Sequence, residues 1–128
     1  MIKLTFCLRR KAGLSLEEFQ RYWRDQHAPL VAKHSQVLGI RRYVQSHTVP
    51  HDAISGAQRA RAASADAVPK PYDGVAELWF DSETALARLE SDSDAAQAGL
   101  ELLQDEAKFI DLTNSPLWLA REHQIVGD

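Results

Sequence analysis

One histidine near the end of the first predicted helix has the clearest capacity for chemistry in this sequence. His27 follows an amphipathic stretch and precedes Ala28-Pro29, where the proline removes a backbone donor. An imidazole titrates near neutral pH and serves as a general acid or base, but a histidine at a helix C-terminus is also a favourable cap. From the residues alone, both interpretations of His27 remain open.

The other reactive side chains give weaker signals. No neighbour in the sequence activates Cys7 as a nucleophile, so we interpret it as a small strand residue. His47 and His51 flank a proline and therefore do not share a helical face as zinc ligands do, and we expect no metal site. Asp105 and Asp111, near the end of the last helical stretch, are interpreted as solvated polar residues.

Periodic apolar residues predict the elements that must position these side chains. Ser15 and Glu18 form a capping-box pattern that opens a helix. We expect a break or kink near His27-Ala28, with a second helical stretch from Pro29 to about Gln36. Alternation predicts the strands, and helical spacing predicts two further helices. The strands are expected at residues 2–9, 40–49, 75–80 and 117–125, and the further helices at 82–89 and 94–109.

The element order βαββαβ predicts an α+β, ferredoxin-like fold in a single domain over residues 1–128. Right-handed crossovers lead us to expect strands one and three in the centre and parallel to each other, with strands two and four at the edges. Residues 50–72 form a long loop or lid insertion in this scheme, with a weak helix at 57–67. Helices on one face leave the other sheet face bare, which predicts cover by a second copy.

Side-chain parity assigns the residues of this open sheet face. On strand three the apolar side suits the helices, so Glu77 and Trp79 face outward; on strand two, Ile40 and Val44 are assigned to the helices. Glu77 needs a donor, and His47 or Tyr43 is the expected partner. The predicted open-face set is Thr5, Cys7, Tyr43, Gln45, His47, Glu77, Trp79 and Trp118, joined by Glu122. Aromatic walls with sparse polar groups fit a ligand pocket, and they equally fit a dimer interface.

Composition narrows the classes of partner. The chain has 128 residues, a net charge of −3 and no basic block, which argues against nucleic acid. No apolar run approaches the roughly 20 residues that cross a bilayer, so we expect no membrane partner. The N-terminus does not have the pattern of a signal peptide, and a single cysteine fits a reducing compartment, so we expect a cytoplasmic protein.

Three segments resemble the EthD family. They are Lys11–Leu30, which includes the run Tyr22-Trp-Arg-Asp-Gln-His-Ala-Pro-Leu30, then Gly39–His47 and Tyr72–Phe80. The resemblance implies an antiparallel ferredoxin-like sheet that packs face to face with a second copy, as a dimeric α/β barrel around ligand-sized cavities. Founding members are associated with bacterial ethyl tert-butyl ether degradation beside a cytochrome monooxygenase system.

Similar proteins suggest a chemistry. Methylmuconolactone isomerases and polyketide dehydratases or cyclases act on small ring compounds by proton transfer, without metal or organic cofactor. Their helix-end histidine matches His27 and their second-strand tyrosine matches Tyr43, whereas the match to His47 is looser. The resemblance therefore implies His27 as acid or base, with Tyr43 and His47 orienting a ligand.

Three functions follow as hypotheses. The first is cofactor-free proton transfer, of the isomerase or dehydratase kind, on a small aromatic, lactone or polyketide-like compound. The alternative is a non-enzymatic accessory or carrier protein of an ether- or xenobiotic-degrading monooxygenase system, in which the pocket binds without turnover. A third, less favoured, is cofactor-independent oxygenation; haem binding is placed low because no histidine is clearly placed as an axial ligand.

Overall fold

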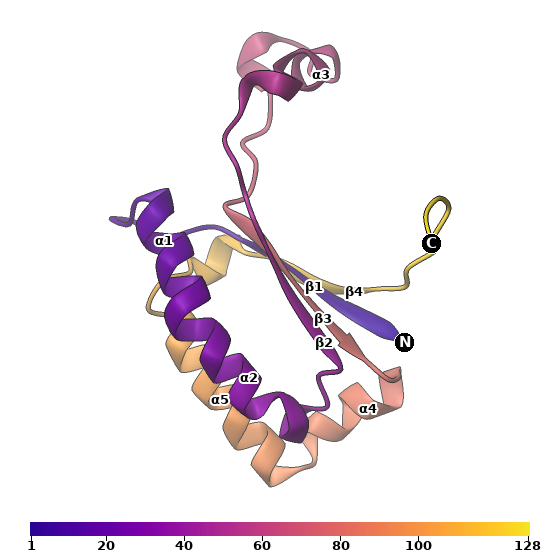
Figure 1. Cartoon of the computed structure of the whole chain (residues 1–128). Helices are drawn as coiled ribbons and strands as arrows, with labels where there is room; N and C mark the ends of the chain where they lie inside the picture. The colour runs from indigo at the N-terminus through magenta and orange to yellow at the C-terminus, as the bar shows by residue number, and fades with distance from the viewer.

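One four-stranded sheet forms the framework of the molecule (Figure 1). A computed structural model describes all residues from 1 to 128. The strands are β1 (Ile2–Leu8), β2 (Arg42–His47), β3 (Gly74–Phe80) and β4 (Leu117–Ala120), and they lie in the order β2-β3-β1-β4. Every neighbouring pair is antiparallel, as the α+β ferredoxin-like fold requires.

The two central strands were expected to be parallel, and that expectation is wrong. β1 and β3 are central but antiparallel, with Ile2 opposite Phe80 and Leu8 opposite Gly74. The first crossover joins β1 to β2, so those two strands run in the same direction, and β3 returns between them in the opposite one. The predicted edge positions of β2 and β4 are confirmed.

The helices lie on one face of the sheet (Figure 1). The first rod comprises α1 (Leu16–Tyr22), a π-helical turn (Trp23–His27) and α2 (Ala28–Leu38), and it packs beside α5 (Ser93–Glu106). The capping box is confirmed, because the Ser15 side chain accepts from the Glu18 backbone amide and the Glu18 side chain accepts from that of Ser15. Gly39 ends α2 with φ of 73°, a left-handed conformation that suits glycine.

The irregularity expected near His27 takes the form of a π-turn rather than a break. The Ala28 amide donates to the Trp23 carbonyl, five residues earlier, while Pro29 has no amide hydrogen to donate. The wider turn tolerates the missing donor, so the rod continues into α2. Such turns also change which side chains a helix directs to its neighbours.

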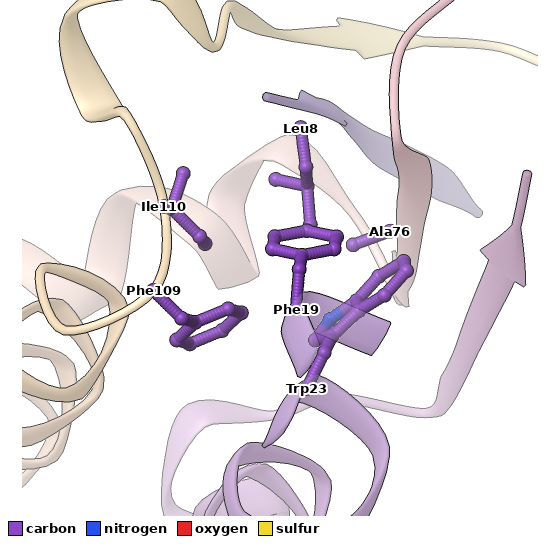
Figure 2. Packing of buried hydrophobic residues seen from close by; sticks show 6 residues of the cluster. All are labelled: Leu8, Phe19, Trp23, Ala76, Phe109 and Ile110. Carbon is purple, nitrogen blue, oxygen red and sulfur yellow. The ribbon is translucent and has the colours of Figure 1, made fainter. Parts of the chain in front are cut away.

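Two apolar clusters hold the helices to the sheet and to each other. The first contains Leu8, Phe19, Trp23, Ala76, Phe109 and Ile110. Figure 2 shows the Phe19 ring between those of Phe109 and Trp23, with Leu8 above it. The second cluster joins α2 to α5 through Val31, Leu38, Ala95, Ala98 and Leu102. The predicted inward positions on the last long helix are confirmed, since Ala95, Ala98, Leu102 and Phe109 are all buried.

The segment between β2 and β3 forms an arm that extends away from the sheet and helices (Figure 1). It carries α3 (Ser55–Ala60) and a 3-10 turn at Ala65–Ala67, within the region where a weak helix was expected. Its function as a lid stays a prediction.

The ends of the other elements differ little from expectation. A short helix, α4 (Glu83–Ala87), follows β3. β4 ends at Ala120 rather than at residue 125, because the chain leaves the sheet and brings the Glu122 carboxylate to the Trp79 indole nitrogen. None of the helices combines the length and the apolar character needed to cross a membrane.

Candidate functional site

The side chains of β2 face opposite to the direction expected from parity. Tyr43 lies opposite Leu78, Gln45 opposite Ala76, and paired residues share a face of the sheet, so these side chains and that of His47 point toward the helices. Ile40 does pack against the helices, but residues 40–41 form a bend before the strand begins at Arg42. Counting alternate residues from Ile40 therefore assigned the wrong face, and Val44 lies on the open one.

The rest of the predicted open-face set is where parity placed it. Thr5 pairs with Glu77 and with Trp118, Cys7 pairs with Val75, and Trp79 pairs with Lys3 and Arg42; all of these share the open face. The partner of Glu77 is the ammonium group of Lys3, at 2.6 Å, and not His47 or Tyr43. Trp118 is exposed on this face, whereas Cys7 and Trp79 are already buried in the single chain. The role of these residues as a ligand pocket stays a prediction.

A partly enclosed cavity of about 50 Å³ lies between the opposite face of the sheet and the helices. Its walls are mainly apolar, and three titratable side chains, His27, Tyr43 and Glu106, share it. The structure therefore brings His27 and Tyr43 together, as the resemblance implied, but on the helix side of the sheet. The apolar walls come chiefly from Phe6, Leu8, Val31, Leu78, Leu102 and Ile110, with Trp23 beside them.

His27 forms a buried pair with Asp105. The imidazole is 5 % exposed, and its Nδ1 lies 2.8 Å from the Asp105 Oδ2, which joins the π-turn to the last turn of α5. Burial lowers the pKa of His27 below its ordinary value and outweighs the opposing effect of Asp105, so the ring is neutral at neutral pH. An acceptor at Nδ1 favours the tautomer with its proton on Nδ1 and the lone pair on Nε2.

Asp105 is itself held by several donors. The Tyr22 hydroxyl donates to its Oδ1 at 2.6 Å, and the Lys108 ammonium lies 3.4 Å from the same oxygen. Burial acts to raise the pKa of Asp105, but the hydrogen bonds from Tyr22 and His27 outweigh it and keep that pKa below its ordinary value. The Tyr22 phenol has a pKa raised to about 12 by burial and by this carboxylate. Asp105 is thus an ionised residue that positions His27.

Glu106 lies next to Asp105 in sequence and is one of the residues that line the cavity. Burial, and secondly the charge of Asp105, raise the pKa of Glu106 to about 7, and no hydrogen bond contributes to that shift. A carboxyl group with this pKa is about half protonated at neutral pH. It is the one acidic side chain among the residues that line the cavity.

A row of hydrogen bonds follows β2 from the cavity outward. The Gln45 amide nitrogen donates to the Tyr43 hydroxyl at 2.8 Å and to the Trp23 carbonyl at 3.0 Å, while Gln45 Oε1 lies 2.8 Å from His47 Nε2. The His47 ring stacks on Trp23 with centroids 4.5 Å apart. His47 does not line the cavity, so it acts on Tyr43 only through Gln45. The Tyr43 hydroxyl accepts from Gln45 and retains its own hydrogen to donate.

Sequence reasoning missed Asp105, Glu106 and Tyr22. The interpretation of Asp105 as solvated is wrong, because the residue is 9 % exposed and paired with His27. A signal was present: Asp105 and Glu106 follow Leu102 by three and four residues, which places two carboxylates on the apolar stripe of their helix. Tyr22 was interpreted as packing, and no local pattern reveals a hydrogen bond to a residue 83 positions away.

A larger, open groove of about 370 Å³ lies on the outer surface beside α1. It contains charged side chains of both signs, among them Arg21, Asp25 and Lys108, but none of His27, Tyr43 and Glu106. We therefore place the candidate site at the enclosed cavity. The structure groups no three His, Cys, Asp or Glu side chains in a way that could hold a metal ion.

Comparison with known proteins identifies the family of this chain. The family model of the EthD domain matches residues 11–113, which span the first helix, the arm, the sheet strand β3 and α5. The chain belongs to the EthD family. The matched region of this EthD domain contains His27, Tyr43, Asp105 and Glu106. No match is found among curated proteins.

Solved structures share the fold of this EthD domain. An EthD family protein of Bacillus halodurans is 20 % identical, with a TM-score of 0.60, and the match covers 96 % of this chain and 99 % of that one. An EthD-like protein of Ralstonia eutropha is 19 % identical, with a TM-score of 0.57 over 93 % and 88 % of the two chains. A dimeric protein of Bacteroides fragilis with a ferredoxin-like fold is 9 % identical, with a TM-score of 0.56 over 94 % and 95 %.

Proposed function

We propose that this EthD domain binds a small carbonyl compound in the enclosed cavity and moves protons on it, with His27 as the base. The observation that carries the proposal is the pair of His27 and Asp105 at the cavity wall. Asp105 fixes the ring through Nδ1, and Nε2 has no hydrogen-bond partner in the chain. Every fully buried side-chain nitrogen or oxygen in the chain has a hydrogen-bond partner. Because Nε2 has none, it is not fully buried, and a small molecule in the cavity can reach it.

Tyr43 gives the site a second polar function. Its hydroxyl hydrogen is free to donate to a ligand oxygen, because Gln45 already supplies the bond that the hydroxyl oxygen accepts. His47 supports this arrangement from the end of the row, as the partner of Gln45. The acid or base in this scheme is His27, and Tyr43 orients the ligand.

The size of the cavity restricts the ligand. About 50 Å³ holds a few water molecules, whereas pockets for drug-sized ligands are about 300–1,000 Å³. A lactone or an aromatic ring therefore enters only if side chains such as Trp23 or Leu78 move. Small cyclic carbonyl compounds fit with the least movement.

The test uses α-angelica lactone, an unsaturated five-membered lactone whose proton shift to the conjugated isomer is followed by ultraviolet absorbance. Wild type is expected to accelerate the shift, and His27→Ala to lose about 10²–10⁴-fold in kcat, the usual contribution of a positioned proton-transfer group. His123→Ala, a change at an exposed histidine, is the matched control and should leave the rate unchanged.

Two outcomes would contradict the proposal. Equal rates for wild type and His27→Ala would remove His27 from the chemistry. Binding of the lactone by wild type without any isomerisation would favour the alternative of an accessory or carrier protein, for which a monooxygenase system is the proposed partner.

The assembly we propose is a homodimer formed through the open sheet face. A single layer of helices covers one face of the sheet (Figure 1), and on the opposite face the Trp118 side chain of β4 is 47 % exposed. Apolar surface of this kind on one face favours association. The Bacteroides fragilis protein that shares the fold is dimeric, which supports the proposal of a dimer.

A further inference from the structure

Glu106 is the one carboxyl group at the cavity that no part of the chain engages. Asp105, its neighbour, is occupied by Tyr22, His27 and Lys108. The Glu106 side chain, by contrast, shares the cavity with His27 and Tyr43 and forms no ion pair. A carboxyl group placed against mainly apolar walls without a partner is costly unless it is protonated or meets a ligand.

No positive charge beside the cavity favours ionisation of Glu106, and the adjacent Asp105 carboxylate opposes it. The groups that face Glu106 are His27 from the π-turn, Tyr43 from β2 and the adjacent Asp105 on α5. No lysine or arginine lines the cavity, and Lys108 reaches Asp105 from the outer surface. An anionic ligand would therefore meet no counter-charge in this site.

We propose that Glu106 is the acid that works opposite His27, and that it restricts the site to uncharged carbonyl compounds. This proposal rests on the proposed function of the cavity and deepens it, because it names the second proton-transfer group and the charge class of the substrate. The chemistry is enolisation. His27 and Glu106 act on different atoms of the same ligand.

The proton balance of the step is complete without any further reactant. His27 Nε2 takes the proton from the carbon next to the carbonyl, and the electrons of that C–H bond form a C=C bond. The carbonyl π electrons move to oxygen, which takes the proton of Glu106 and gives an enol, an imidazolium and a carboxylate. The imidazolium then returns its proton to another carbon of the conjugated system, and the carboxylate recovers the enol proton, which restores both groups.

The protonation states needed for this step are those that burial favours. A pKa of about 7 for Glu106 and a lowered pKa for His27 make the neutral pair the dominant form between the pKa of His27 and pH 7. Activity is then expected to fall as the pH rises above 7, because Glu106 loses its proton. It also falls at acid pH, where His27 gains one.

The first experiment follows the Glu106 carboxyl carbon directly by NMR, in protein labelled with carbon-13 at the glutamate side-chain carboxyl position. Glu106→Gln assigns the resonance by its absence, and the exposed Glu90 serves as the reference carboxyl. We expect Glu106 to titrate near pH 7. Titration at the ordinary value for glutamate would overturn the proposal whatever the activity.

The second experiment separates acid catalysis from packing. Glu106→Gln keeps the shape and a hydrogen-bond donor but has no proton to transfer, so kcat for α-angelica lactone should fall about 10²-fold or more. The residual activity should also lose its decrease above pH 7. Glu106→Asp, which retains an acid, should recover part of the rate, and Glu90→Gln should match wild type.

The third experiment tests charge selection. Binding of the neutral lactone and of levulinate, a small keto acid that is anionic at pH 8, is measured by the change in tryptophan fluorescence, since Trp23 lines the cavity. Wild type should prefer the lactone at least 10-fold, and Glu106→Gln should reduce that preference several-fold.

The pattern of results distinguishes this proposal from the one on which it rests. If His27→Ala loses turnover while Glu106→Gln keeps the wild-type rate and ligand preference, the role of Glu106 is overturned and the proposed function stands. If His27→Ala keeps turnover, the proposed function itself fails.

Discussion

At the scale of single residues, two adjacent carboxylates on α5 have opposite electrostatic situations. Asp105 receives hydrogen bonds from Tyr22 and His27, which keep its pKa low, whereas Glu106 has no such donor and its pKa rises to about 7. Adjacent helical residues point about 100° apart, so one side chain reaches the buried imidazole and the other the cavity. Asp105 is therefore ionised and positions His27, whereas Glu106 titrates near neutral pH.

The raised pKa of Glu106 predicts a pH-dependent contribution to stability. Between its unfolded value near 4.5 and its folded value of about 7, the folded state binds more protons than the unfolded state. The contribution is therefore complete below pH 4.5 and is lost as the pH rises through 7. From pH 5 to pH 8, wild type should lose about 2–3 kcal/mol more of its free energy of unfolding than Glu106→Gln.

Urea denaturation at the two pH values measures this difference. Glu90→Gln, at an exposed position, should follow wild type. Parallel pH profiles for wild type and Glu106→Gln would show that Glu106 titrates alike in the folded and unfolded chains.

At the scale of elements, the site depends on how closely the π-turn approaches β3. The ring of Trp23 lies over Gly74 and stacks on His47, so the start of β3, the end of β2 and the helical rod meet at one point. A Cβ at Gly74 would collide with the Trp23 ring, and the Ser46 carbonyl oxygen is only 3.1 Å from that position. Glycine is needed here for space and not for an unusual backbone angle.

Gly74→Ala is expected to destabilise the fold by about 2 kcal/mol, because Trp23 must leave a well-packed cluster. Since Trp23 also lines the cavity, the variant should change the near-ultraviolet circular dichroism of the tryptophan. Gly56→Ala is the matched control: it lies in α3, where a Cβ meets nothing within 4 Å, and it should be neutral or slightly stabilising. Equal urea midpoints for both variants would contradict the close approach.

At the scale of the whole molecule, the sheet has two different faces. One is covered by the helical rod and α5 (Figure 1). This face contains the cavity, while the other bears the Lys3–Glu77 ion pair, Trp79 and Trp118. Because the polar groups of the open face pair with one another, a second copy can cover this face without leaving Lys3 or Glu77 unpaired. The cavity lies within one chain, so the proposed dimer interface and the proposed ligand site lie on separate faces of the sheet.

If the proposed homodimer forms through the open sheet face, a charge introduced on that face should dissociate it. Trp118→Glu puts a carboxylate on the open face near Glu77 and should shift the protein from dimer to monomer in sedimentation velocity experiments at micromolar concentration. Leu103→Glu changes an equally exposed apolar residue on the outer side of α5 and should leave the dimer intact. A monomeric wild type under the same conditions would contradict the proposed assembly.

The sequence by itself determined the order of elements, the family and the position of His27 before Pro29. Alternation, helical spacing and the Ser15 capping box are local patterns, and they are set by residues within a few positions of each other. For the same reason the sequence placed the strand β3 and the inward face of α5 correctly. The bend before β2 is also local, but no residue type in it indicates a bend. Because of this bend, Tyr43, Gln45 and His47 face the helices and not the open side that parity predicted.

Only the tertiary structure decided which residues form the site. His27 and Asp105 are 78 positions apart, and Tyr22 and Asp105 are 83 apart, so their contacts depend on how the helical rod packs against α5. The same packing encloses the cavity and raises the pKa of Glu106 through burial, which no sequence pattern contains. The chemistry proposed for this protein therefore rests on the meeting of two helices and one strand. The sequence named His27, Tyr43 and the supporting Gln45 and His47, but not Asp105 or Glu106 as members of the site.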